Sequence, residues 1–237
     1  MSIYERQKQI MQYLKEKNFA TVKELSVLVY ASEASVRRDI KVLADRGLLH
    51  PIYGGVVLPE YKNGVVPIRL RDTSHTAAKE EIARAAAEMI FDGATVIMDG
   101  STTVRRIIKY IKASPVYIIT NNVRILNEEL PDGVTVYGTG GLFLPQSNIF
   151  VGKGAQSFLN GINADLLFFS SQAISSTGEI SDASEEETAL RQAMLTRAKK
   201  RIFLCDASKL GQTRTFTVCT REDVDTILCD APLPWEE

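Results

Sequence analysis

Short polar groups of residues recur along this sequence, and their side chains and main-chain amides are of the types that bind anions. Residues 99–103 read Asp-Gly-Ser-Thr-Thr, and residues 120–122 read Thr-Asn-Asn. Related groups occur at 138–141, 170–172 and 206–209, the last ending in Lys209. Clustered amides and hydroxyls can surround a phosphate, and a lysine adds a point charge. Taken together, the five groups predict noncovalent binding of a phosphorylated polyol.

The elements that position these groups alternate along the chain. Helices are expected over 77–90, 104–111, 123–130, 154–160 and 184–200, and apolar strands over 94–99, 116–120, 134–138, 164–170, 201–206, 215–219 and 226–230. This alternation favours a parallel sheet covered on both faces, which binds ligands beyond the carboxyl ends of its strands. In any one loop these residues could simply cap a helix, so the prediction depends on five loops at one edge.

A second group of residues lies near the start of the chain, where Arg37 and Arg38 are adjacent. Ser32 is a good N-cap for a helix there, and Val36, Ile40 and Leu43 recur at the helical period. Ala34, Ser35, Arg38 and Lys41 then face solvent, with Arg37 on the flank. A solvated helix face is the alternative interpretation of such an arginine pair.

Two further helices and a hairpin surround this helix. Ile3, Gln7, Ile10, Met11 and Leu14 form a helical stripe, and Thr21 with Glu24 has the pattern of a capping box that opens a second helix. Residues 48–58 read as a β-hairpin. Three helices and a hairpin predict a winged helix-turn-helix, in which small residues allow entry into the major groove and arginines contact phosphates or guanine edges. The DNA-binding candidates are Thr21, Ser32, Ala34, Ser35, Arg37, Arg38 and Lys41.

The stretch SEASVRRDIKVLADRGLL, with the later Gly-Gly pair, resembles the signature of the DeoR family of bacterial transcription regulators, and the similarity covers nearly the whole chain. Ser35 stands where the family usually has threonine. Pro51, Ile52 and Tyr53 replace the usual Arg-x-His before the glycines, which leaves Tyr53 as a substitute wing contact with DNA.

The resemblance implies that the larger domain has the ribose-phosphate isomerase fold and that the loop at 99–103 holds the phosphate of an effector. Gly-Ser stands there where many members have Ser-Gly. Family blocks also match in order around the other candidates, and the segment SSQAISSTG at 170–178 departs from many relatives, which bears on which sugar is accepted. The effector-binding candidates are Asp99, Gly100, Ser101, Thr102, Thr103, Thr120, Asn121, Asn122, Gly140, Gly141, Asp182, Glu187 and Lys209.

The fold class expected is therefore α/β, with a winged helix-turn-helix domain over 1–57, a linker over 58–74 and a mostly parallel effector domain over 75–237. The chain has 237 residues, of which 45% are hydrophobic, and a net charge of −1, values that are ordinary for a globular protein. Three cysteines without paired spacing favour reduced thiols and a cytoplasmic protein. No run of residues suggests a membrane span.

The predicted function is a sequence-specific regulator, a repressor of a sugar-metabolism operon controlled by a phosphorylated sugar. Its expected partners are double-stranded operator DNA, the sugar phosphate and further copies of itself, as a homodimer or homotetramer. No cofactor, metal or catalytic residue is expected. The alternative is a sugar-phosphate isomerase-type enzyme with an accessory N-terminal domain, although the acidic and glycine-rich motifs of such enzymes are missing.

Overall fold

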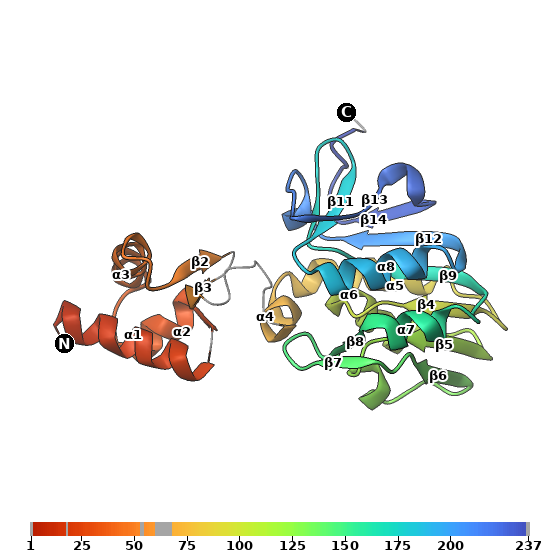
Figure 1. The fold of residues 1–237 in the computed structure, drawn as a ribbon, viewed down its shortest axis with the longest axis horizontal. Coiled ribbons are helices and arrows are strands. Elements are labelled where there is room, and N and C mark those ends of the chain that lie inside the picture. Colours follow the sequence, from red (N-terminus) through yellow and green to blue (C-terminus); the bar gives the residue numbers. More distant parts are fainter. Residues whose placement is uncertain (1, 18, 53–54, 60–67, 236–237) are drawn as a thin grey trace. The chain divides into compact units, whose positions relative to one another are not determined.

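The computed structural model describes residues 2–17, 19–52, 55–59 and 68–235, and the chain forms two compact units, residues 1–70 and 71–237. Figure 1 shows the helices and strands of each unit. The predicted domain limits at 57 and 74 differ from this division, and the segment between them contains a short helix, α4 (Ile68–Thr73). The remaining linker residues at 60–67 lie outside the described residues.

The N-terminal unit contains three helices and a small antiparallel sheet with strand order β1-β3-β2. Its elements are α1 (Ile3–Lys17), β1 (Phe19–Thr21), α2 (Val22–Leu28), α3 (Glu33–Asp45), β2 (His50–Ile52) and β3 (Gly55–Val57). Strand β1 was not predicted, because three residues are too few to show an alternating pattern. It pairs with β3 along its whole length, from Phe19 opposite Val57 to Thr21 opposite Gly55.

The core of this unit follows the helical periods in the sequence. Ile10 and Leu14 from α1 pack with Leu25 from α2 and with Val36 and Ile40 from α3. Ile3 was expected on the same stripe but is 63% exposed, because it occupies the first turn of α1, beyond the reach of the other helices. The three helices and the hairpin form a winged helix-turn-helix.

The C-terminal unit is built on a six-stranded sheet in which every neighbouring pair of strands is parallel. The strand order is β14-β12-β9-β4-β5-β6, as Figure 1 shows. These strands are β4 (Thr95–Met98), β5 (Val116–Thr120), β6 (Val134–Gly138), β9 (Ala164–Phe169), β12 (Ala198–Cys205) and β14 (Thr226–Cys229).

Helices cover both faces of this sheet, as the unbroken apolar strands predict. Helices α5 (Thr76–Ala87) and α6 (Thr102–Arg105) belong to one core cluster, and α7 (Gly152–Leu159) and α8 (Glu185–Leu195) to the other. The smaller strands are β7 (Leu142–Leu144) with β8 (Ile149–Val151), and the sheet of β10 (Ala173–Ile174), β11 (Glu179–Asp182) and β13 (Phe216–Thr220). No helix in the described part of the chain is long and apolar enough to cross a membrane.

Three predicted helices differ from the structure. The helix expected over 184–200 ends at Leu195, and β12 begins at Ala198, because the chain there joins the parallel ladder opposite Ala164 of β9. The helix expected over 123–130 is a single 3-10 turn, Ile125–Asn127. The helix expected over 104–111 is divided into α6 and the 3-10 helix Arg106–Tyr110.

Candidate functional site

Helix α3 presents most of the predicted DNA-binding side chains to solvent. Ser32 is its N-cap, and the Ser32 side chain accepts a hydrogen bond from the amide of Ser35 at 3.3 Å. Ser35 is half-buried. Ala34, Arg37, Arg38 and Lys41 are exposed on the part of the helix that does not face the core.

The two arginines of α3 make only weak contacts within the protein. Arg37 lies 3.5 Å from the carboxylate of Glu33, one helical turn away, and both side chains are largely exposed. The Nε atom of Arg38 donates to the main-chain carbonyl of Ala34 at 3.4 Å. Such surface contacts contribute little, so both guanidinium groups can be redirected to a partner.

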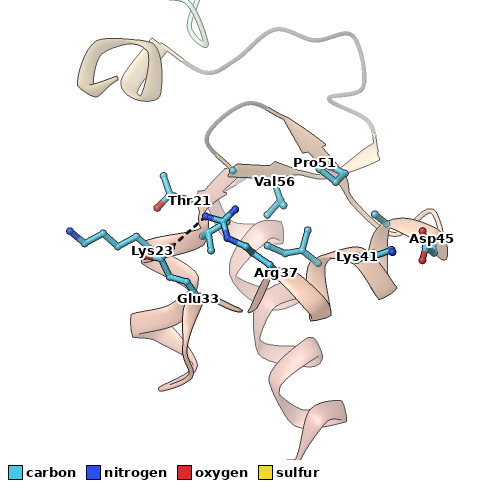
Figure 2. A pocket seen from close by; sticks show the side chains of 12 residues that line it. Thr21, Lys23, Glu33, Arg37, Lys41, Asp45, Pro51 and Val56 are labelled. Carbon is cyan, nitrogen blue, oxygen red and sulfur yellow. Dashed lines mark hydrogen bonds and ion pairs between the residues drawn. The ribbon is translucent and has the colours of Figure 1, made fainter. Parts of the chain in front are cut away.

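A groove runs beside α3, and Figure 2 shows Arg37 and Lys41 within it. Thr21, the N-cap of α2, and Lys23 in its first turn line this groove, and the hairpin contributes Pro51 and Val56. Thr21 also closes the predicted capping box, because its Oγ1 accepts from the amide of Glu24 at 3.0 Å. Tyr53, the predicted wing contact, lies outside the described residues.

Helix α1 holds α3 through a charged contact that the sequence did not reveal. Asp39 points inward from α3 and is only 3% exposed. Its carboxylate accepts bonds from the Arg6 guanidinium, with Nη2 at 3.2 Å from Oδ1, and from Nε2 of Gln7 at 3.2 Å. The outward face of α3 is thereby oriented by α1.

The second group of candidates lies where the order of the large sheet reverses. The chain runs from β4 outward through β5 and β6, then returns to β9 on the opposite side of β4. Crevices at such switch points are the usual ligand sites of open parallel sheets. Asp99 and Gly100 follow β4 here, and Ser170 follows β9.

Asp99 joins the two loops at this point. Its Oδ1 accepts from the amide of Ser101 at 3.0 Å, and its Oδ2 accepts from the amide of Ser170 at 3.2 Å. Gly100 is required beside it, since a Cβ there would collide with the side chain of Ile149 in β8. The loop after β4 is therefore closely packed against β8.

Arg191 of α8 connects three of the candidate region's carboxylates. Its guanidinium donates to Asp99 at 2.8 Å, to Asp182 at 3.0 Å and to Glu187 at 3.0 Å. All four side chains are at most 5% exposed. Burial alone lowers the pKa of Arg191, but the three carboxylates outweigh it and raise that pKa above its usual value.

The remaining oxygens of these carboxylates are also engaged. Ser147 donates to Oε1 of Glu187 at 2.9 Å. The amide of Ala183 donates to Oδ1 of Asp182 at 2.7 Å, whereas Ser171 donates to the carbonyl of Ser181 at 2.6 Å. Asp99, Gly100, Asn121, Glu187 and Arg191 line one small internal cavity.

The hydroxyl groups of the 99–103 loop have different surroundings. Ser101 caps α6, accepting from the amide of Val104 at 3.1 Å. Thr102 donates to the main-chain carbonyl of Arg71 at 3.3 Å. The Oγ1 atom of Thr103 is buried and has no hydrogen-bond partner in the described structure.

The residues after β5 are buried and fix neighbouring strands. Thr120 donates to the carbonyl of Met98 at 2.7 Å, and Asn122 accepts from the amide of Arg124 at 3.0 Å. Asn121 donates from Nδ2 to the carbonyl of Phe150, whereas its Oδ1 lacks a partner among the described residues. Asn121 thus has an acceptor available to a ligand hydroxyl.

Gly140 and Gly141 lie after β6 and have positive φ angles of 61° and 110°. A Cβ on Gly141 would come within 2.6 Å of the carbonyl of Val151 and 2.9 Å of the amide of Ala155. Gly141 is therefore needed for its close approach to the start of α7. The contacts described for this pair do not join it to the Arg191 network.

Lys209 and a lysine missed by sequence reasoning lie near the carboxyl end of β12. Lys209 donates to Oγ of Ser170 at 2.6 Å. Lys79 of α5 is 4% exposed and donates to the carbonyl of Arg71. Burial, followed by the nearby charge of Lys209, lowers the pKa of Lys79 to about 8.

Asp206 balances part of this positive charge. It is 2% exposed, and although burial opposes ionisation, the charge of Lys209 and a bond from Ser208 lower its pKa.

The burial of Lys79 could have been predicted from the sequence, because Lys79 lies at the helical spacing of the buried Ile82, Ala83 and Ala86 of α5. Arg191 is in phase with Leu190 and Met194 of α8 in the same way. In the described residues, no cluster of His, Cys, Asp and Glu could hold a metal ion.

Comparison with known proteins agrees with both halves of this architecture. Residues 6–62 match the DeoR-like helix-turn-helix domain, and residues 74–231 match the DeoR C-terminal sensor domain. A protein of Escherichia coli O157:H7, named as a candidate aga operon transcriptional repressor, is 31% identical over 97% of this chain and 87% of its own length. The transcriptional repressor GlcR of Bacillus subtilis is 30% identical over 95% of this chain and 88% of its own length.

A winged helix-turn-helix joined to a sensor domain defines a DNA-binding transcription regulator. The chain belongs to the DeoR family of these regulators, and it is not an enzyme. Ribose 5-phosphate isomerase A from Methanocaldococcus jannaschii gives a TM-score of 0.42 at 15% identity, over 58% of this chain and 55% of that one. A likeness of that size supports no conclusion about activity.

Proposed function

We propose that this regulator is a repressor of a sugar-metabolism operon and that a phosphorylated sugar controls its binding to operator DNA. The observation that carries the effector half is the pair of lysines, Lys79 and Lys209, near the point where the sheet order reverses. Lys79 is buried and Lys209 is half-buried, and a buried cation is costly without an anionic partner. Asp206 supplies one negative charge to this pair, and a phosphate would supply the remainder.

The polar residues around the lysines support a ligand with a hydroxyl-rich body. Thr102 offers a hydroxyl to the phosphate, and Asn121 offers its Oδ1 atom, which has no hydrogen-bond partner among the described residues. Amide oxygens accept hydrogen bonds from sugar hydroxyls. We assign the phosphate to the side of Lys79 and Lys209, and the sugar to the side of Asn121.

The DNA-binding half rests on α3. Ala34 and Ser35 are small enough for the start of the helix to enter the major groove, and Arg38 extends from the exposed face. Arg37 and Lys41 lie along the groove beside the hairpin, where they would contact the DNA backbone (Figure 2). Two copies of this unit would read two half-sites one helical turn apart, so we propose a homodimer or homotetramer.

The role as a repressor is supported by the relatives, since both of those compared above carry that description. The test begins with thermal shift of the full chain against a panel of sugar phosphates, with each unphosphorylated sugar as the matched control. A ligand at 100 times its Kd adds roughly 2.7 kcal/mol to the free energy of unfolding.

A sugar phosphate that stabilises the protein is then added to an anisotropy assay with DNA from upstream of the gene and its neighbours. We expect stabilisation by a phosphorylated sugar, none by its free counterpart, and a change in DNA affinity when the phosphorylated sugar is present. Equal stabilisation by the free sugar would contradict the phosphate site. Unchanged DNA affinity at saturating ligand would contradict effector control.

A further inference from the structure

The last turn of α4 is held to the C-terminal unit by three arginines. Asp72 accepts from Nη2 of Arg105 at 3.1 and 3.2 Å and from Nη2 of Arg124 at 2.5 Å. Arg106 donates to the Asp72 carbonyl at 2.5 Å and to its carboxylate at 3.3 Å. Burial opposes ionisation of Asp72, but the bonds from Arg124 and Arg105 outweigh it and lower its pKa.

These arginines are close in sequence to the proposed effector site. Arg105 and Arg106 are separated from Thr102 and Thr103 by Val104 alone, and Arg124 is separated from Asn121 and Asn122 by Val123 alone. Asp72 thus contacts the continuation of two loops that the proposed ligand would touch.

The residue before Asp72 contacts the proposed phosphate site itself. The main-chain carbonyl of Arg71 accepts from Oγ1 of Thr102 at 3.3 Å and from Nζ of Lys79. A threonine hydroxyl has a single proton, so Thr102 cannot donate to this carbonyl and to a phosphate oxygen at once. A lysine has three N–H donors and can serve both acceptors.

Phosphate binding and docking of α4 therefore compete for Thr102. We propose that the Arg71 carbonyl and the Asp72 carboxylate form the contact that couples the effector site to the chain leading to the DNA-binding unit. This inference rests on the proposed function, because it needs a phosphate beside Thr102 and Lys79. When phosphate arrives, Thr102 turns from the Arg71 carbonyl to the ligand, and α4 keeps only its remaining contacts.

Electrostatic attraction between the bound phosphate and Arg106 adds to this competition. The Arg106 charge acts on Lys79, so Arg106 is also within electrostatic range of a phosphate bound there. A dianion at that position would draw Arg106 and so weaken its bonds with Asp72. A ligand acts on an equilibrium only through such a difference in contacts between two states.

Hydrogen exchange of the full chain tests this coupling, with inorganic phosphate as the probe and chloride at matched ionic strength as the reference. In the wild-type protein we expect phosphate to accelerate exchange in peptides covering residues 68–73 by about 3- to 10-fold, the change expected from losing one ordinary hydrogen bond. Calorimetry under the same conditions measures whether phosphate binds.

The Asp72→Asn variant keeps the shape of the side chain and removes its charge. We expect faster exchange at 68–73 without phosphate and little further change when phosphate is added. Phosphate should bind about 2- to 10-fold more tightly, because α4 of the variant has already lost part of the docking that phosphate must otherwise disrupt. Asp165→Asn is the matched control. Asp165 pairs with the exposed Lys199, and the two residues lie at the amino ends of β9 and β12, whereas the candidate site lies at the carboxyl ends. It should behave as the wild type.

The outcomes separate the two proposals. Phosphate binding with unchanged exchange at 68–73 would overturn the coupling contact and leave the effector site intact. An Asp72→Asn protein with wild-type exchange and wild-type phosphate affinity would overturn the role of Asp72. Absence of phosphate binding by calorimetry would overturn the phosphate site and the coupling together. The wild-type comparison decides the matter even if Asp72→Asn fails to fold.

Discussion

Nε of Arg191 lies 2.8 Å from Oδ2 of Asp99, and this contact joins α8 to the end of β4 across 92 positions of sequence. Both side chains are almost completely buried. The same guanidinium satisfies Asp182 and Glu187, so one cation is shared by three carboxylates. Removing it would leave a cluster of buried negative charges without compensation.

Replacing Arg191 with methionine should therefore destabilise the C-terminal unit by about 3–5 kcal/mol, the usual cost of breaking a buried ion pair from one side. Urea unfolding monitored by circular dichroism measures this. Lys199→Met is the control, because Lys199 is 75% exposed and its ion pair with the half-buried Asp165 should contribute at most about 1 kcal/mol. Equal effects of the two substitutions would show that the Arg191 network is not a stabilising centre.

Arg38→Ala should weaken operator binding by about 1–3 kcal/mol and relax specificity at one base pair, if Arg38 reads a base edge. Its only described bond, to the Ala34 carbonyl, is long, so the fold should be unaffected. Anisotropy with operator variants measures both effects. Lys8→Ala, an exposed lysine on α1, serves as the control and should leave specificity unchanged.

Arg37→Ala should act differently from Arg38→Ala, because Arg37 lies on the flank of α3 in the groove beside the hairpin. A backbone contact lowers affinity for all sequences alike and makes the dependence of binding on salt less steep, by a slope of about 1. Titrations at several salt concentrations measure this slope. An Arg37→Ala protein with the wild-type slope would exclude a phosphate contact.

Lys209→Ala should weaken binding of the phosphorylated effector by roughly 10- to 150-fold, the value of a charge-assisted hydrogen bond of about 1.5–3 kcal/mol. Thr102→Val should also weaken it, by the smaller value of a neutral hydroxyl contact. The Lys209→Ala protein should keep near-normal operator affinity without the effector. Calorimetry beside the operator assay measures these effects, and a Lys209→Ala protein that binds the effector normally would exclude the site.

Effector binding should weaken as the pH rises through about 8, because the buried Lys79 loses its proton near that value. Phosphate favours the charged amine, so above pH 8 binding must be accompanied by proton uptake, and affinity should fall by up to about tenfold per unit. The free energy of unfolding should change in the opposite direction. Between about 8 and 10.5 the unfolded chain holds this proton and the folded chain does not, so this group's contribution to stability rises with pH.

Lys79→Arg provides the matched test, since arginine stays charged across this range. Calorimetric titrations between pH 7 and pH 9.5 should then show an affinity that no longer falls with pH. A pH dependence that persists in Lys79→Arg would assign it to a different group.

The N-terminal unit could be predicted well because its signals are local. Ser32 caps α3 as expected, and Val36, Ile40 and Leu43 are all buried at their helical spacing. The parallel strands could be found for a similar reason, since each is a short, almost unbroken apolar run. Such features depend on neighbours within one element.

The contacts that organise the candidate site could not be predicted, because they join distant parts of the chain. Arg191 was visible only as part of a helix, and nothing local shows that it meets Asp99. The end of α8 was misplaced for the same reason: residues 198–200 have reasonable helix propensity, and only the ladder with β9 places them in a strand. The close approach of Gly141 to Val151 and Ala155 could not be predicted for the same reason.

The contact of Asp39 with Arg6 and Gln7 fixes the inward side of α3, whereas the proposed DNA contacts lie on its outward side. The orientation of the helix depends on inward residues, and the proposed DNA contacts involve Arg38 and its exposed neighbours, so the two tasks share no side chain. Descendants of one ancestral regulator could therefore acquire new operators by exchanging outward residues alone, while the angle of the helix was inherited unchanged.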